Sequence, residues 1–280
     1  MQKTLINGKE STHIDVRDRG LQYGDGVFET IACRAGQLEL WPLHMQRLES
    51  ACLRLSLPLV DPQLWLNDIA ALELKSDAVI KLSITRGVSA RGYAFTEEIS
   101  VTRVCTAYAL AEFSPHNQQG ITAIVCDTPV SANRALAGVK HLNRLDNVLA
   151  RNEWKDSAIA EGIMLDENQH VIEGTMSNVF AVTGNEIYTP VLDQSGVQGV
   201  MRDLVIELAE SLGIKVNIIE ISRQNLLNMD EIFITNSLIG IWPVVKIVDH
   251  QTVYDYSHQQ VVSFLKKYLP QSISNNSRSI

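Results

Sequence analysis

The chain has 280 residues, of which 45% are hydrophobic, and its formal net charge is −8. A chain of this length can bury a sizeable core and favours two domains over one. The acidic balance argues against a nucleic-acid binder, and no apolar stretch approaches the about 20 residues of a membrane span.

The positions of the cysteines and histidines indicate the cellular compartment and whether a metal site is expected. The four cysteines, at positions 33, 52, 105 and 126, form no C-x-x-C pair and predict reduced thiols in or near the core. The polar N-terminal residues do not resemble a signal peptide, so we expect a cytoplasmic protein. The seven histidines lack the close spacing of a metal site, and we expect no metal.

Strand-like and amphipathic stretches alternate through the first half of the chain. Residues 27–40 predict two strands around Ala35-Gly36, and a helix is expected to follow from Pro42. Residues 78–87 and 100–110 predict further strands. The first half therefore predicts a sheet with helices.

The second half repeats this mixture. Residues 120–128 predict a strand, and a helix is expected to begin near Leu142. Residues 162–190 predict a meander of strands with turns at Glu-Asn and Gly-Asn pairs. Residues 203–213 predict an amphipathic helix that Gly213 ends.

A polar stretch at 111–120 marks the expected domain boundary. We predict an N-terminal α/β domain over 1–112, a linker over 113–119 and a C-terminal α/β domain over 120–270. Residues 271–280 are too polar to pack and are predicted to be a flexible tail. The expected fold class is α/β (α+β).

The helix after Pro42 turns two basic side chains inward. A step of about 100° per residue places His44 near the centre of the apolar stripe and Arg47 on its flank. A buried guanidinium costs several kcal/mol unless an anion meets it. That anion is either a ligand's phosphate or carboxylate or an internal salt-bridge partner, and the helix alone favours the salt bridge.

Two further segments could hold an anion. In "SGVQGVMRD", residues 195–203, two glycines precede a helix and offer backbone N–H groups, although such glycines are usually only turns. Residues Thr235 to Ser237 follow a strand-like run and offer hydroxyl and amide groups. The alternative for this second segment is a turn or a helix N-cap.

Lys140 and Glu173 are ionisable residues in apolar surroundings. Burial of Lys140 among leucines and valines would favour a neutral, nucleophilic amine, whereas the ordinary alternative is a lysine that extends to solvent. Glu173 follows Val171 and Ile172, so its carboxylate is either solvated or paired with a cation such as a protonated ring nitrogen. Pyridoxal phosphate would account for the lysine, the carboxylate and the anion-binding segments together.

Seven marker segments carry a resemblance to a known family. They are "DRGLQYGDGVFET", "HMQRL", "TRGVSARGY", "GVKHLNRLDNVLAR", "EGTMSNVF", "GVQGVMR" and "FITNSLIGIWPV". In this order and spacing they resemble the class IV aminotransferases, the fold-type IV pyridoxal-phosphate enzymes, from near the start to about residue 269. The resemblance implies a two-domain fold like that of the D-amino-acid aminotransferases and a homodimer with sites near the interface.

The resemblance also assigns cofactor residues. Lys140 matches the lysine that bonds covalently to pyridoxal 5'-phosphate, and Glu173 matches the acid opposite the ring nitrogen. The implied phosphate contacts are Arg47, the amides of Val200 and Met201, and the segment of Asn236 and Ser237.

The substrate side departs from the D-amino-acid transaminases. Arg91 occupies the position where those enzymes hold a substrate carboxylate, but Phe28 replaces their tyrosine and Tyr93 their histidine. The sequel "KHLNRL" resembles the lyases of the family, which implies β-elimination of 4-amino-4-deoxychorismate to 4-aminobenzoate and pyruvate in folate biosynthesis. The residues expected to contact this substrate are Arg91, Tyr93, Phe28, His141 and Arg144.

Two other activities stay open. A branched-chain or D-amino-acid transaminase would share every cofactor residue, and branched-chain enzymes also carry phenylalanine at the position of Phe28. A non-catalytic pyridoxal-phosphate binder is the remaining alternative. The expected partners are a small-molecule substrate and a second copy of the chain, with no nucleic acid and no membrane.

Overall fold

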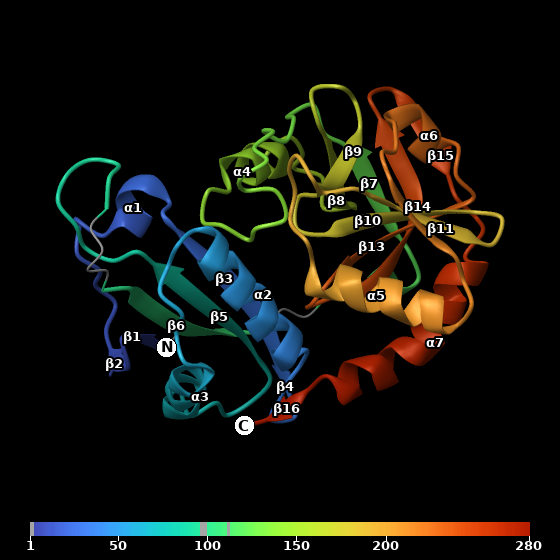
Figure 1. Ribbon diagram of the computed structural model, residues 1–280. Helices are drawn as coiled ribbons and strands as arrows, with labels where there is room; N and C mark the ends of the chain where they lie inside the picture. The colour runs from blue at the N-terminus through green and yellow to red at the C-terminus, as the bar shows by residue number, and fades with distance from the viewer. Residues whose placement is uncertain (1–2, 96–99, 111–112) are drawn as a thin grey trace. The chain divides into compact units, whose positions relative to one another are not determined.

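The computed structural model describes residues 3–95, 100–110 and 113–280 (Figure 1). The chain divides into two compact units. Unit 1 comprises Met1–Ala111, Val139–Asn143 and Ile273–Ile280, and unit 2 comprises Glu112–Gly138 and Arg144–Ser272. The division is more interleaved than the predicted domains, because the segment with Lys140 and the C-terminal residues belong to unit 1.

Unit 1 is built on a seven-stranded antiparallel sheet with the order β16-β4-β3-β5-β6-β1-β2 (Figure 1). Its strands are β1 (Thr4–Ile6), β2 (Lys9–Glu10), β3 (Gly26–Arg34), β4 (Gln37–Leu38), β5 (Ala78–Thr85), β6 (Thr102–Ala109) and β16 (Arg278–Ser279). The two strands predicted around Ala35-Gly36 are confirmed as β3 and β4. Both turn residues have positive φ, 48° and 73°, as a tight hairpin requires.

The helices of unit 1 are α1 (Arg19–Tyr23), α2 (Trp41–Arg54) and α3 (Pro62–Ala71). Of these, α2 and α3 pack on one face of this sheet. Helix α2 packs along β3 and confirms the helix predicted from Pro42 (Figure 1). Leu48 on α2 and Trp65 on α3 join Ile31 and Leu82 of the sheet in one buried cluster, and this cluster fixes α2 against β3.

Unit 2 is built on a nine-stranded mixed sheet. Eight strands follow the order β12-β11-β10-β13-β14-β7-β8-β9, and β15 pairs with β14. The strands are β7 (Ile121–Val125), β8 (Ile159–Leu165), β9 (Val171–Gly174), β10 (Asn178–Thr183), β11 (Glu186–Pro190), β12 (Val216–Ile219), β13 (Glu231–Asn236), β14 (Gly240–Asp249) and β15 (Thr252–Asp255). The strands predicted over 162–190 are present as β8 to β11, but the predicted meander is wrong. They form two separate antiparallel pairs, β8 with β9 and β10 with β11, because β10 pairs with β13 on its other side.

The helical segments of unit 2 are η1 (Pro115–Gln118), α4 (Leu145–Arg151), α5 (Val200–Ser211), α6 (Arg223–Leu227) and α7 (Gln260–Asn275), the last extending into unit 1. Segment η1 lies in the predicted linker. Helix α4 begins at Leu145 rather than near Leu142, because His141 forms a strand-like bridge with Val27 and Leu142 lies in a bend. Gly213, at a φ of 76°, follows α5 as predicted.

The C-terminal residues differ from the prediction of a flexible tail. Helix α7 continues to Asn275, and β16 then pairs with β4. Gln37 Nε2 also donates a hydrogen bond of 2.8 Å to Ser279 Oγ. An added edge strand is held by backbone and polar side-chain bonds, so a polar composition does not prevent it.

Within the described residues, no helix is both long enough and apolar enough to cross a membrane.

Candidate active site

The segment with Lys140 lies against β3 in unit 1. Phe28 N–H donates to Lys140 O at 3.0 Å, and Leu142 N–H donates to Gly26 O at 3.0 Å. A Cβ at Gly26 would lie 2.2 Å from Ile84 O and 2.8 Å from Leu142 Cδ1. Glycine at position 26 therefore allows the segment to approach the sheet.

The register separates the side chains of Lys140 and His141. His141 pairs with Val27, so these two side chains share one face of the extended pair, and Lys140 shares the other with Phe28. Lys140 Nζ lies 4.5 Å from the centroid of the Phe28 ring. Val27 belongs to the buried core, so His141 is on the face of the sheet that carries this core. Lys140 and Phe28 lie together on the other face.

Lys81 was not among the predicted site residues. This half-buried residue on β5 pairs with Thr30, and its Nζ lies 5.1 Å from the centroid of the Phe28 ring. No ion pair joins Lys81 to an acid within the part of the chain that the structure describes. The sequence offered a sign of this residue, because a lysine stands inside the apolar run "AVIKLSIT" and burying an unpaired ammonium is costly. Two ammonium groups thus lie near one aromatic ring.

The two inward basic residues of α2 share an acid on β3. Arg47 Nε donates to Glu29 Oε1 at 2.8 Å, and Arg47 Nη2 donates to Glu29 Oε2 at 2.5 Å. His44 Nδ1 lies 2.6 Å from Glu29 Oε2. The anion that Arg47 requires is therefore supplied inside unit 1, as the salt-bridge alternative predicts.

Charges in this cluster shift two pKa values. Burial raises the pKa of Glu29, but Arg47 and then His44 outweigh it and lower this pKa to about 2. Burial lowers the pKa of His44, the charges of Arg47 and Lys140 lower it further, and Glu29 opposes them. Glu29 is therefore ionised at neutral pH and holds Arg47 in a fixed orientation.

In unit 2, Glu173 ends up buried next to two polar groups. Its side chain on β9 is 4% exposed, and its Oε2 accepts the Val197 N–H at 2.8 Å. Asn147 Nδ2 lies 3.5 Å from its Oε1. Burial lowers the pKa of Arg144, which the charge of Glu173 opposes. The predicted residues Glu173 and Arg144 therefore lie in one electrostatic environment.

The start of α5 and the end of β13 offer groups that could bind an anion. Gly199 precedes the helix without a side-chain cap, and a Cβ there would lie 2.1 Å from Asn178 Oδ1. Thr235 pairs with Asn178 in the sheet and is fully buried. Its Oγ1 has no hydrogen-bond partner among the residues that the structure describes. A helix N-terminus with a buried donor nearby suits an anion.

Asn236 has a structural role in the segment after β13. Its Oδ1 accepts the N–H groups of Leu238 and Ile239 at 2.8 and 3.0 Å, and its Nδ2 donates to Met176 O at 3.0 Å. The Asn236 side chain therefore stabilises a turn, which is the alternative that the sequence left open. The buried hydroxyl of this segment belongs to the neighbouring Thr235, and Ser237 is half-buried.

Arg91 and Tyr93 lie exposed in the loop that follows β5. Tyr93 is 85% exposed, and Arg91 is also exposed. Arg19 anchors the backbone of this loop, because its guanidinium donates to Gly92 O at 2.8 Å and to Tyr93 O at 2.9 Å. The loop backbone is held while both predicted substrate side chains face outward.

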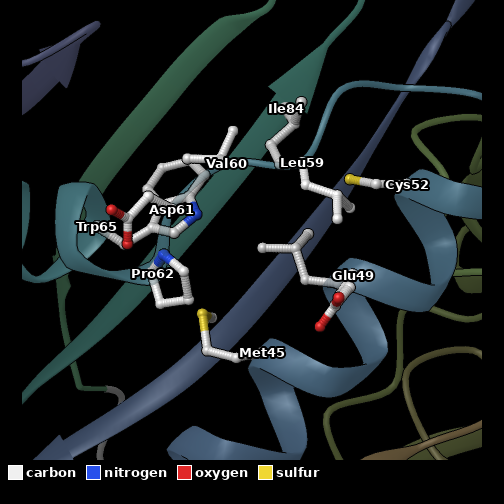
Figure 2. A pocket seen from close by; sticks show the side chains of 10 residues that line it. Met45, Glu49, Cys52, Leu59, Val60, Asp61, Pro62, Trp65 and Ile84 are labelled. Carbon is white, nitrogen blue, oxygen red and sulfur yellow. The ribbon is translucent and has the colours of Figure 1, made fainter.

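A cavity of about 170 Å³ lies in unit 1 among α2, α3 and β5. Figure 2 shows Met45, Cys52 and Trp65 among the side chains around it. None of the predicted site residues lines this cavity. It is therefore separate from the residues that carry the predicted chemistry.

Known proteins resemble this chain over most of its length. The family model for amino-transferase class IV matches residues 26–247. An aminodeoxychorismate lyase of Vibrio harveyi is 36% identical over 90% of this chain and 93% of its own. A putative branched-chain-amino-acid aminotransferase of Methanocaldococcus jannaschii is 33% identical, with 88% of each chain covered.

A solved structure adds a comparison of folds. The crystal structure of 4-amino-4-deoxychorismate lyase from Pseudomonas aeruginosa matches with a TM-score of 0.87 and 38% identity. The match covers 97% of this chain and 98% of that one.

Proposed function

Because this chain belongs to the class IV amino-transferase family, we propose that it is a pyridoxal-phosphate-dependent lyase that forms 4-aminobenzoate and pyruvate from 4-amino-4-deoxychorismate. The observation that carries the proposal is Lys140, which lies beside an aromatic ring and a second ammonium group on one sheet face. The two lyase relatives, each similar over at least 90% of this chain, support the choice of reaction.

The residues present fit pyridoxal phosphate. The start of α5, which has no side-chain cap among the described residues, and the buried hydroxyl of Thr235, which has no partner there, would hold the phosphate. Glu173 is a buried carboxylate suited to a protonated ring nitrogen. From the likeness to the family, Lys140 is proposed to bond to the cofactor, and Arg47, whose guanidinium Glu29 holds in unit 1, is kept as a proposed phosphate contact.

Each proposed catalytic residue moves or holds one proton. When bound, pyridoxal phosphate withdraws the electron pair from the substrate carbon next to the amine. Lys140 Nζ takes the proton from C4 of the substrate. Glu173 keeps the proton on the ring nitrogen. The electron pair of the broken C4–H bond then forms the C3–C4 double bond as the C3–O bond breaks, so the remaining ring becomes aromatic. The enolpyruvate leaves as its enolate, takes up one proton in place of the one that Lys140 removed, and becomes pyruvate.

The substrate carries two carboxylates, and the sheet face around Phe28 could bind one of them. Lys81 is a half-buried cation that shares the Phe28 ring with Lys140. An anion at Lys81 would compensate the cost of desolvating its ammonium. We therefore assign a substrate carboxylate to Lys81, and we keep Arg91 and Tyr93 as candidates for the other.

The protein is proposed to act as a homodimer in the cytoplasm. Near the exposed Arg91 loop, Val16, Leu21 and Phe95 also expose apolar side chains, which supports a partner surface in this part of unit 1. All four cysteines are free and buried, as the sequence predicts, and this supports a reducing compartment.

Covalent trapping tests the cofactor assignment. Borohydride reduction of the wild type with pyridoxal phosphate should attach the cofactor to Lys140, and Lys140→Ala should abolish both the label and turnover. Lys155→Ala is the matched control, because Lys155 is an exposed lysine that bonds only Asn152 among its described neighbours. Labelling of another lysine in the active wild type would show that Lys140 is the wrong residue.

A further inference from the structure

Glu161 is a buried carboxylate to which the proposed reaction gives no role. The residue lies on β8 and is 0% exposed. Its Oε1 accepts Thr175 Oγ1–H at 2.5 Å and the Gly162 N–H at 2.9 Å. Its Oε2 accepts Ser177 Oγ–H at 2.7 Å. No ion pair joins Glu161 to a cation over residues 3–95, 100–110 and 113–280. Burying such a group is costly, so its donors require an explanation.

These donors belong to the turn that directly follows Glu173. The turn is closed by the Gly174 N–H, which donates to Ser177 O at 2.7 Å. The Thr175 N–H also donates to Glu161 Oε1 at 3.1 Å. A Cβ at Gly174 would lie 2.2 Å from Ser177 Oγ and 2.9 Å from Glu161 Oε2, so glycine lets the carboxylate pack under the turn. Glu161 therefore fixes the shape of residues 174–177.

The backbone of the same turn also accepts hydrogen bonds from two asparagine side chains, Asn147 and Asn236. Thr175 O accepts Asn147 Nδ2–H at 3.1 Å, and the same amide nitrogen lies 3.5 Å from Glu173 Oε1. Met176 O accepts Asn236 Nδ2–H at 3.0 Å. A displacement of the turn would move both contacts, one beside the proposed acid and one beside the proposed phosphate segment.

We propose that Glu161 is a positioning residue that holds Glu173, through the 174–177 turn and Asn147, in the orientation that the cofactor ring requires. The inference rests on the proposed pyridoxal-phosphate function. It predicts that loss of the Glu161 carboxylate changes how Glu173 meets the ring nitrogen, although Glu161 touches neither cofactor nor substrate.

The test compares Glu161→Gln with Glu153→Gln in the full chain with pyridoxal phosphate. Glu153 is a matched control, because its two oxygens accept the backbone N–H groups of Asp127 and Thr128, each at 2.8 Å, and neither of these residues belongs to the 174–177 turn. Glu161→Gln should raise the cofactor Kd about tenfold and lower kcat about 10- to 100-fold, as is typical when supporting partners of a ligand are removed. The pH midpoint of the bound-cofactor absorbance should also shift, and Glu153→Gln should leave all three values within about twofold.

A second background tests the route through Asn147. In Asn147→Ala protein, adding Glu161→Gln should change the absorbance midpoint little, because the connection to Glu173 is already lost. Ser177→Ala removes one donor and keeps the carboxylate, so it should shift the midpoint in the same direction by less, even if Glu161→Gln fails to fold.

Three outcomes would overturn the proposal. The first is a wild-type midpoint in both Glu161→Gln and Ser177→Ala while the wild type binds the cofactor. The second is a full effect of Glu161→Gln in the Asn147→Ala background. A wild type that binds no pyridoxal phosphate would instead refute the proposed function, and the role of Glu161 with it.

Discussion

Replacing Thr235 by valine separates the stability of the cofactor-free protein from its affinity for the cofactor. The Thr235 hydroxyl is fully buried and lacks a partner among the described residues. A buried unsatisfied hydroxyl costs about 1–3 kcal/mol, and valine has nearly the same shape, so Thr235→Val should raise the free energy of unfolding by about 1 kcal/mol. If the hydroxyl donates to the cofactor phosphate, its loss removes about 1.5–3 kcal/mol of binding, which raises Kd about 10- to 150-fold.

The assays are urea unfolding of the cofactor-free protein and spectroscopic titration with pyridoxal phosphate. Thr189→Val is the matched control, because Thr189 is equally buried in unit 2 but donates to Val179 O at 2.9 Å. This control should lose about 1 kcal/mol of stability and keep its cofactor Kd. Pyridoxal, which lacks the phosphate, should bind Thr235→Val and the wild type alike. A destabilised Thr235→Val protein with unchanged Kd would refute the assignment of Thr235 to the phosphate.

Three further predictions concern charged residues. Glu173→Gln should keep the cofactor but lose about 100-fold or more in kcat, because an amide does not hold the ring-nitrogen proton; near-normal turnover would exclude Glu173. Lys81→Met should raise KM for the dicarboxylate substrate about tenfold and leave the cofactor Kd unchanged, whereas an unchanged KM would remove Lys81 from the substrate site. Although burial raises it, the pKa of Glu29 is lowered to about 2 by Arg47 and His44, below its ordinary 4.5. Its stabilising contribution is therefore complete above about pH 4.5 and lost as the pH falls towards 2, so unfolding curves of the wild type and Glu29→Gln should converge over that range.

Local patterns predicted the regular elements well. The alternation around Ala35-Gly36 predicted β3 and β4, and the apolar stripe after Pro42 predicted α2, because both signals depend on neighbours in the sequence. The C-terminal strand was missed, since β16 is defined by its pairing with β4, about 240 residues away in the sequence. The amino-acid composition of the C-terminal residues does not predict that pairing.

Side-chain partners were harder to predict than side-chain types. The sequence indicated that Arg47 needs an anion, but it did not identify Glu29, because that partner depends on how α2 lies on β3. In the same way, the polar segment 235–237 was found, while the roles of Thr235 and Asn236 within it required the structure. His141 was expected at the substrate, and only its register with Val27 places it on the face opposite Lys140.

The stoichiometry of turnover tests the central claim most directly. Purified protein with bound pyridoxal phosphate is supplied with 4-amino-4-deoxychorismate in the absence of any keto acid, and both products are measured over time. A lyase returns its cofactor to Lys140 in each cycle, so 4-aminobenzoate and pyruvate should appear in equal amounts over many turnovers. If no 4-aminobenzoate forms while amino groups pass steadily from D-alanine or leucine to 2-oxoglutarate, the protein is a transaminase and the account is contradicted.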